Sequence, residues 1–154
     1  TGQLAGRPPL IDLEREARVG GFVREAIACG ILGSAHDCSD GGLCVALAEP
    51  SMASDLGIAV DLKLGDVRLD RVLFAEGGSR IVVSVKAERL GDWEALIRDH
   101  ADLPVTHLGA VTTTPRLTIQ SDQGLVMDLG LDQCLDAYDK ALPRRISSGI
   151  DFQE

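Results

Sequence analysis

Residues 34–49, Ser-Ala-His-Asp-Cys-Ser-Asp-Gly-Gly-Leu-Cys-Val-Ala-Leu-Ala-Glu, join a polar turn directly to an apolar run. Apolar residues of that run recur at helical spacing and predict a helix, namely Leu43, Ala46 and Leu47. Ser39 or Asp40 can cap its first turn, while Gly41 and Gly42 let backbone N–H groups approach a ligand or a strand. Two interpretations follow: an ordinary capped turn, or a helix start that binds an anion whose metal ion the carboxylates hold.

A second glycine-rich turn, Glu76-Gly77-Gly78-Ser79, separates a predicted short helix at 69–75 from a strand at 80–85. The strand is nearly continuous in β-branched residues, so we expect it to be buried. Glu76 and Arg80 flank the glycines. The turn can hold a hydroxyl or a phosphate, although a salt bridge or a helix cap is the more common role for such a pattern.

The remaining elements follow from periodicity and from turn residues. Asp12 is an expected N-cap of a helix that ends before Gly30, and Pro50 should stop or kink the helix that starts after the first turn. Further strands are predicted at 31–37, 58–62, 104–111, 116–120 and 124–129, and further helices at 87–100 and 131–142. This order predicts an α+β fold with a mixed β-sheet covered mainly on one face by helices.

Composition narrows the class of protein. The chain has 154 residues, a length that suits one domain, and a formal net charge of -9 from 24 acidic and 15 basic residues. Nucleic acid and anionic membrane surfaces would be repelled by that charge. No apolar run approaches the roughly 20 residues of a membrane helix, and no leader opens the chain, so we expect a cytoplasmic location.

Two motifs together resemble the C-terminal domain of the phosphoribosylformylglycinamidine synthase family. They are Ser34–Glu49 and the run Leu73-Phe-Ala-Glu-Gly-Gly-Ser-Arg-Ile-Val-Val-Ser-Val85. The lead-in Pro-Pro-Leu-Ile-Asp-Leu-Glu-Arg-Glu, residues 8–16, fits the same family. Relatives in the wider aminoimidazole ribonucleotide synthetase superfamily tend to carry Thr-Gly-Gly-Gly or similar turns, whereas Ser39-Asp40-Gly41-Gly42 is typical of the synthase.

The resemblance implies part of an ATP-dependent ligase of purine biosynthesis. In that family ATP phosphorylates the amide oxygen of formylglycinamide ribonucleotide, and ammonia derived from glutamine displaces the phosphate. The implied cofactors are Mg²⁺ and ATP, and both require a preceding nucleotide-binding domain of the same enzyme. That domain, a glutaminase subunit or domain, and the ribonucleotide are the implied partners.

By the same resemblance, the two turns carry the site residues. Asp37 falls where the first half of the family's chain has a magnesium-binding aspartate, and Glu76-Gly77-Gly78 falls where it has a substrate-binding Glu-Ser-Gln. The implied substrate-binding residues are Ser39, Asp40, Gly41, Gly42, Glu76, Gly77, Gly78, Ser79 and Arg80, with Asp37 toward the metal. No catalytic residue is expected in this chain, because the family's catalytic histidine and ATP-binding lysine lie in N-terminal domains.

Some departures leave alternatives open. Gly77 and Gly78 lack the side chains of Glu-Ser-Gln. In this family, the nucleotide site of the second half also tends to be auxiliary rather than catalytic. The alternative to a metal-binding role for Asp37 is therefore a purely structural one. We expect residues 1–10 to be a linker remnant, 11–142 the synthetase-like domain and 143–154 a flexible tail, and we expect no synthase activity from the chain alone. A non-catalytic interaction or scaffold module, or a domain of another synthetase of the superfamily, is the alternative function.

Overall fold

The computed structural model describes residues 10–147, which belong to two compact units. The first unit contains residues 1–46 and 66–107, and the second contains residues 47–65 and 108–154. The boundary falls inside one helix, α2 (Gly42–Ser54), between Ala46 and Leu47.

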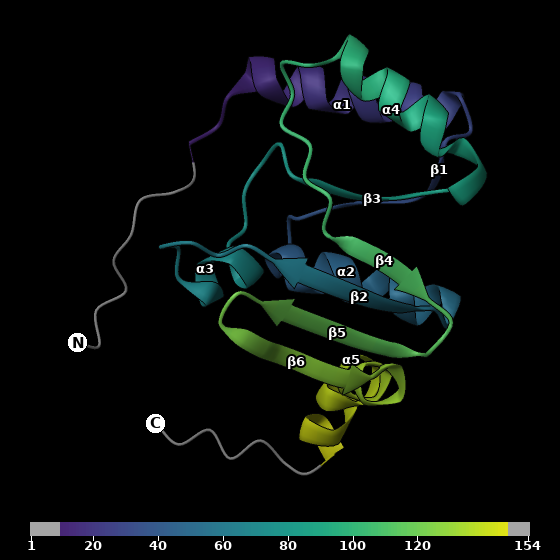
Figure 1. Cartoon of the computed structure of the whole chain (residues 1–154). Helices are drawn as coiled ribbons and strands as arrows, with labels where there is room; N and C mark the ends of the chain where they lie inside the picture. The colour runs from purple at the N-terminus through teal and green to yellow at the C-terminus, as the bar shows by residue number, and fades with distance from the viewer. Residues whose placement is uncertain (1–9, 148–154) are drawn as a thin grey trace. The chain divides into compact units, whose positions relative to one another are not determined.

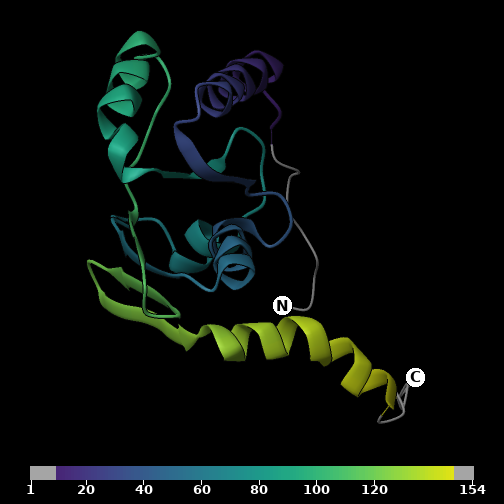
Figure 2. The same cartoon turned by 90° about the vertical axis from the view of Figure 1, so that its right-hand side faces the viewer.

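The first unit is built on a two-stranded antiparallel ribbon, β1 paired with β3. Its elements are α1 (Leu13–Ala28), β1 (Leu32–Asp37), the start of α2, α3 (Leu69–Phe74), β3 (Ile81–Val85), the short 3-10 helix η1 (Ala87–Arg89) and α4 (Leu90–Asp99). Helices α1 and α4 lie on the same side of the ribbon in both views (Figures 1 and 2).

The core of the first unit lies between these two helices and the ribbon. Phe22 and Ala26 of α1 are buried against Leu96 of α4, together with Ile31 and Leu103, and Leu32 and Val85 of the ribbon pack against this cluster. The rings of Phe22 and Trp93 have centroids 5.3 Å apart. The apolar stripes that the sequence places on two helices therefore meet in one core.

A four-stranded mixed sheet, in the order β4-β2-β5-β6, forms the second unit. Its elements are β2 (Gly57–Leu62), β4 (Gly109–Thr112), β5 (Arg116–Ser121), β6 (Gly124–Gly130) and α5 (Leu131–Ser147). Strand β2 runs parallel to β5, and the other neighbours are antiparallel. Leu117 and Ile119 on the central strand β5 are almost fully buried, as is Val60 on β2.

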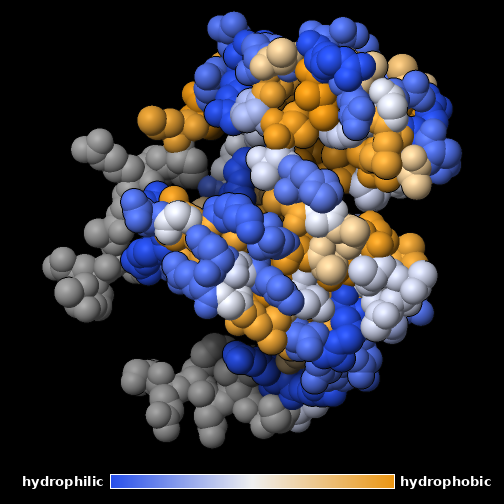
Figure 3. Space-filling view, in the orientation of Figure 1, coloured by the Kyte–Doolittle hydropathy of each residue, from blue (hydrophilic) through white to orange (hydrophobic). Residues whose placement is uncertain are grey.

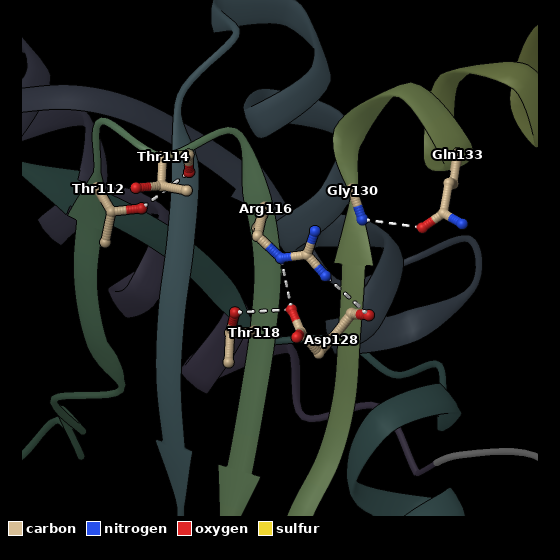
Figure 4. Close-up of polar contacts among 7 residues, drawn as sticks. All are labelled: Thr112, Thr114, Arg116, Thr118, Asp128, Gly130 and Gln133. Atoms are coloured by element: carbon tan, nitrogen blue, oxygen red, sulfur yellow. Dashed lines mark hydrogen bonds and ion pairs between the residues drawn. The ribbon is translucent and has the colours of Figure 1, made fainter.

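Polar contacts join β5, β6 and α5 (Figure 4). Arg116 Nε donates to Asp128 Oδ1 across the β5–β6 pair at 2.8 Å. The Gly130 N–H donates to Gln133 Oε1 at 3.0 Å, as the N3 glutamine of a capping box does, so β6 passes directly into α5.

The predicted α+β class with a mixed sheet is confirmed, and three details differ. Strands β1 and β3 form a separate ribbon outside the mixed sheet. Of the predicted stop or kink at Pro50, the stop near Glu49 is wrong, because α2 continues to Ser54. The Ser54 hydroxyl donates to the Pro50 carbonyl at 2.7 Å. The last helix also passes Pro143 and ends at Ser147, and residues 148–154 of the expected tail lie outside the described residues.

Several large apolar side chains remain exposed. At the start of α1 these are Leu10, Ile11 and Leu13. Figure 3 shows hydrophobic residues, in orange, exposed among hydrophilic ones on the face in view. On α5 a second group follows helical spacing, namely Leu135, Tyr138, Leu142 and Ile146. Among residues 10–147, no helix is long and apolar enough to span a membrane.

Candidate functional site

The pairing of β1 with β3 brings the two glycine-rich turns together. In the antiparallel register Asp37, at the end of β1, lies opposite Ile81, at the start of β3. The turn that follows β1 is therefore adjacent to the turn that precedes β3. The Cys38 N–H donates to the Arg80 carbonyl at 2.9 Å and extends the ladder into both turns.

Gly42 fixes how the start of α2 packs against the end of α3. A Cβ on Gly42 would lie 2.8 Å from the Phe74 carbonyl carbon and 2.9 Å from the Leu73 carbonyl oxygen. Gly42 has φ +69° and Gly41 has φ +74°, a region that favours glycine. Glycine is needed here because of backbone conformation and close packing. An ordinary capped turn, without any ligand, would have the same requirement.

Glu76 joins the two turns directly. Its Oε1 accepts the Gly41 N–H at 3.0 Å, so the carboxylate satisfies a backbone donor just before the first turn of α2. An acidic group near a helix start is also favoured by the helix dipole. Glu76 therefore holds the two glycine turns at a fixed separation.

A residue from a third element completes the site. Glu16 of α1 accepts a hydrogen bond from the Ser79 hydroxyl at 2.8 Å. Ser79 has φ +57°, a left-handed conformation that is uncommon for a residue with a side chain. Glu16 is 63 residues away in the sequence, and no local motif announces its contact with this turn.

These three elements line a hollow of about 290 Å³ in the first unit. Its lining residues are Glu16, Asp37, Ser39, Asp40, Glu76, Gly77, Gly78, Ser79, Arg80 and Ile81. All the residues predicted for the site line the hollow except Gly41 and Gly42. Glu16 and Ile81 are the additions that sequence reasoning missed.

Arg80 serves the fold at this position. Its guanidinium donates to the carbonyl oxygens of Ala75, at 2.9 Å, and Val72, at 3.3 Å. These carbonyls belong to the C-terminal end of α3, where cations are favoured by the helix dipole. Four carboxylates and this single guanidinium thus line the hollow.

Asp37 is exposed and ionised at neutral pH. A hydrogen bond from the Ser39 side chain is the main cause that lowers the pKa of Asp37 below its usual value. Its side chain is 65% exposed. Among residues 10–147, no group of three or more His, Cys, Asp or Glu side chains is arranged to hold a metal ion. Asp37 therefore offers a single hard oxygen donor group to a cation.

Comparison with known families matches residues 1–122 to the family described as AIR synthase related protein, C-terminal domain. Two curated relatives are both a phosphoribosylformylglycinamidine synthase subunit PurL. The one from Synechococcus sp. strain CC9902 is 48% identical over 95% of this chain and 19% of its own length. The one from strain WH7803 is 49% identical over 96% of this chain and 20% of its own length. The chain spans about a fifth of the length of these relatives.

Solved structures share the fold. The Thermotoga maritima PurL complexed with FGAR superposes with a TM-score of 0.73, at 21% identity, over 86% of this chain and 23% of that one. The same protein complexed with ATP gives a TM-score of 0.64, again at 21% identity, over 75% of this chain and 20% of that one. The α+β arrangement described above is therefore found in solved proteins.

Proposed function

This chain belongs to the family of AIR synthase related proteins, C-terminal domain, and from that premise we propose that it is the C-terminal domain of a phosphoribosylformylglycinamidine synthase. The observation that carries the proposal is the likeness, along nearly the whole chain, to synthase subunits at 48% and 49% identity. The whole enzyme would be a ligase of purine biosynthesis.

The proposed reaction has two steps. The amide oxygen of formylglycinamide ribonucleotide attacks the γ-phosphorus of ATP, and ADP leaves. Ammonia derived from glutamine then adds to the activated carbon. The C–O bond breaks, and inorganic phosphate leaves with that oxygen and with a proton from the added nitrogen, which gives the amidine. The residues of this chain that the structure describes supply no catalytic residue to this scheme, and their role would be to complete a ligand site.

The hollow between the glycine turns is the proposed ligand site. It contains the implied metal residue Asp37 and the implied substrate residues except Gly41 and Gly42. Those two glycines act indirectly, because Gly41 holds Glu76 and Gly42 allows α2 to approach α3. Arg80 would shape the site by capping α3, since its guanidinium is bound to backbone carbonyls.

Mg²⁺ and ATP are the proposed cofactors of the whole enzyme. Mg²⁺ in nucleotide sites is held by one or two carboxylates together with phosphate oxygens and water. Asp37, exposed and ionised, fits the part of one such carboxylate, with the remaining ligands supplied by the nucleotide and by water. Bound Mg²⁺ would neutralise phosphate charge that this acidic hollow otherwise repels.

The proposed partners are a preceding nucleotide-binding domain and a glutaminase that supplies ammonia. The chain's share of its relatives, about a fifth, leaves most of the synthase to other segments. A scaffold role is the second candidate, and one observation favours it. Leu135, Tyr138, Leu142 and Ile146 form an exposed apolar stripe on α5, as on a helix that docks onto a partner.

Calorimetric titration tests whether the hollow is a ligand site. We expect the chain joined to the proposed preceding nucleotide-binding domain to bind Mg-ADP or formylglycinamide ribonucleotide, and we expect Asp37→Asn to weaken the binding of Mg-ADP because the metal loses a charged ligand. Asp61→Asn is the matched control, since Asp61 is an exposed carboxylate on β2 that is not among the lining residues. Binding of a protein partner that survives Asp37→Asn, without binding of either small ligand, would favour the scaffold.

A further inference from the structure

Glu16 occupies the space that a side chain at position 78 would need. An added Cβ on Gly78 would collide with Glu16 Oε1, whereas at Gly77 it would meet nothing within 4 Å. A side chain at position 78 would therefore displace the carboxylate that lies over it. Position 78 of the turn carries no side chain, and the Glu16 carboxylate of α1 occupies that space.

The position of Glu16 is fixed by the turn itself. Ser79 donates its hydroxyl hydrogen to Glu16 Oε1 at 2.8 Å, and the bond is partly buried. Glu16 sits in the first turn of α1, and its N–H donates to the carbonyl of the Asp12 cap at 2.9 Å, so its backbone is held by the helix. A carboxylate has about four lone-pair sites, and the one bond to Ser79 leaves acceptor capacity toward the hollow that Glu16 lines.

We propose that Glu16 is a specificity-determining residue that accepts hydrogen bonds from the sugar hydroxyls of a ribonucleotide bound in the hollow. This inference deepens the proposed function and rests on it. Gly77 and Gly78 provide no side-chain polar group to read the ligand, and Glu16 supplies one from another element. A hydrogen bond to a charged acceptor discriminates strongly in favour of ligands that carry the donor.

The charges around Glu16 favour hydroxyl groups over phosphate. Asp37, Asp40 and Glu76 line the same hollow, and the guanidinium of Arg80 donates to the α3 carbonyls. An acceptor-rich wall repels a phosphate and attracts hydrogen-bond donors. The sugar of the ligand is thus assigned to Glu16, and its phosphate to a metal ion or to groups outside this acidic wall.

Backbone amide NMR of the full chain tests this assignment with two probes, ribose 5-phosphate and inorganic phosphate. The amide shifts of Gly77 and Gly78 report binding at the turn. We expect Glu16→Ala to weaken ribose 5-phosphate binding about tenfold or more, and Glu16→Gln, which keeps an acceptor oxygen, to weaken it less. Glu14→Ala, on the first turn of the same helix, should match the wild type. Inorganic phosphate should bind no more weakly to the variants than to the wild type.

Three results would overturn the role of Glu16. They are unchanged binding of ribose 5-phosphate by Glu16→Ala, an equal loss for both probes, which would mean that Glu16 only supports the turn, and no response of the wild-type turn to ribose 5-phosphate. A wild-type chain that, joined to the proposed nucleotide-binding domain, binds Mg-ADP or formylglycinamide ribonucleotide calorimetrically while failing this test leaves the proposed function standing. Conversely, failure of all these ligands removes the hollow as a ligand site.

Discussion

At the residue scale, the glycines at positions 42 and 78 are glycine for different physical reasons. A Cβ at Gly42 meets the backbone of Leu73 and Phe74, which cannot move without displacing α3. A Cβ at Gly78 meets only the end of the Glu16 side chain, which can rotate away once its bond to Ser79 breaks. The first glycine maintains the fold, and the second leaves room for a functional group.

We therefore expect Gly42→Ala to destabilise the chain by roughly 1–3 kcal/mol, because the substitution adds both a backbone collision and an unfavourable φ of +69°. Chemical denaturation measures this free energy of unfolding. Gly91→Ala is the matched control, since Gly91 lies in α4 with nothing within 4 Å of its added Cβ. That control should be neutral or stabilising by up to about 1 kcal/mol. Equal effects of the two substitutions would contradict the packing described at Gly42.

Most of the residues that line the hollow can be predicted from the sequence, and the ligand roles of these residues are proposals. Asp37 and Glu76 stand in turns with recognisable glycine patterns, and the register of β1 and β3 brings those turns together. Glu16 could not be found this way, because its partner Ser79 is distant in sequence and helical periodicity marks only apolar faces.

At the scale of elements, local signals predict helix starts better than helix ends. Asp12 accepts the Arg15 N–H at 3.0 Å and caps α1 as predicted. Pro50 and Pro143, in contrast, lie inside helices, where hydroxyls of Ser54 and Ser147 bond to the two proline carbonyls. Proline removes one backbone donor, yet both helices continue past their prolines.

Strand pairing was the less predictable part. The segment predicted as a strand over 104–111 pairs with β2 only from Gly109 to Thr112, although the Asp61 N–H still reaches the Leu108 carbonyl at 2.9 Å. Alternation of residues identifies a strand but does not state its partner. The division of the strands between a ribbon and a mixed sheet depends on such long-range pairing.

The cap of α5 yields a prediction for an element. Gln133→Ala removes the acceptor of the Gly130 N–H, so we expect a loss of about 0.5–2 kcal/mol and faster amide hydrogen exchange in the first turn of α5. Gln123→Ala provides the control, because Gln123 is an exposed residue in the turn between β5 and β6. Unchanged exchange in α5 would show that this cap contributes nothing measurable.

At the scale of the whole molecule, the acidic net charge and the exposed apolar side chains both favour a protein partner. A net charge of -9 repels nucleic acid, while the apolar residues at the start of α1 and along α5 offer contact area for protein. A domain that spans about a fifth of its relatives is expected to present such surfaces to the other segments. The scaffold and ligase interpretations therefore share these surfaces and differ at the glycine turns.

The central claim is that this chain serves as the C-terminal domain of a synthase. The most direct test is a chimera in which it replaces the aligned fifth of the 49% identical relative from Synechococcus sp. strain WH7803. ATP-dependent amidation of formylglycinamide ribonucleotide with ammonia is then measured. We predict turnover by the chimera. We predict none by the chain alone, and none by the relative from which the aligned segment has been deleted. A folded chimera without turnover, or turnover by the chain alone, would contradict the claim.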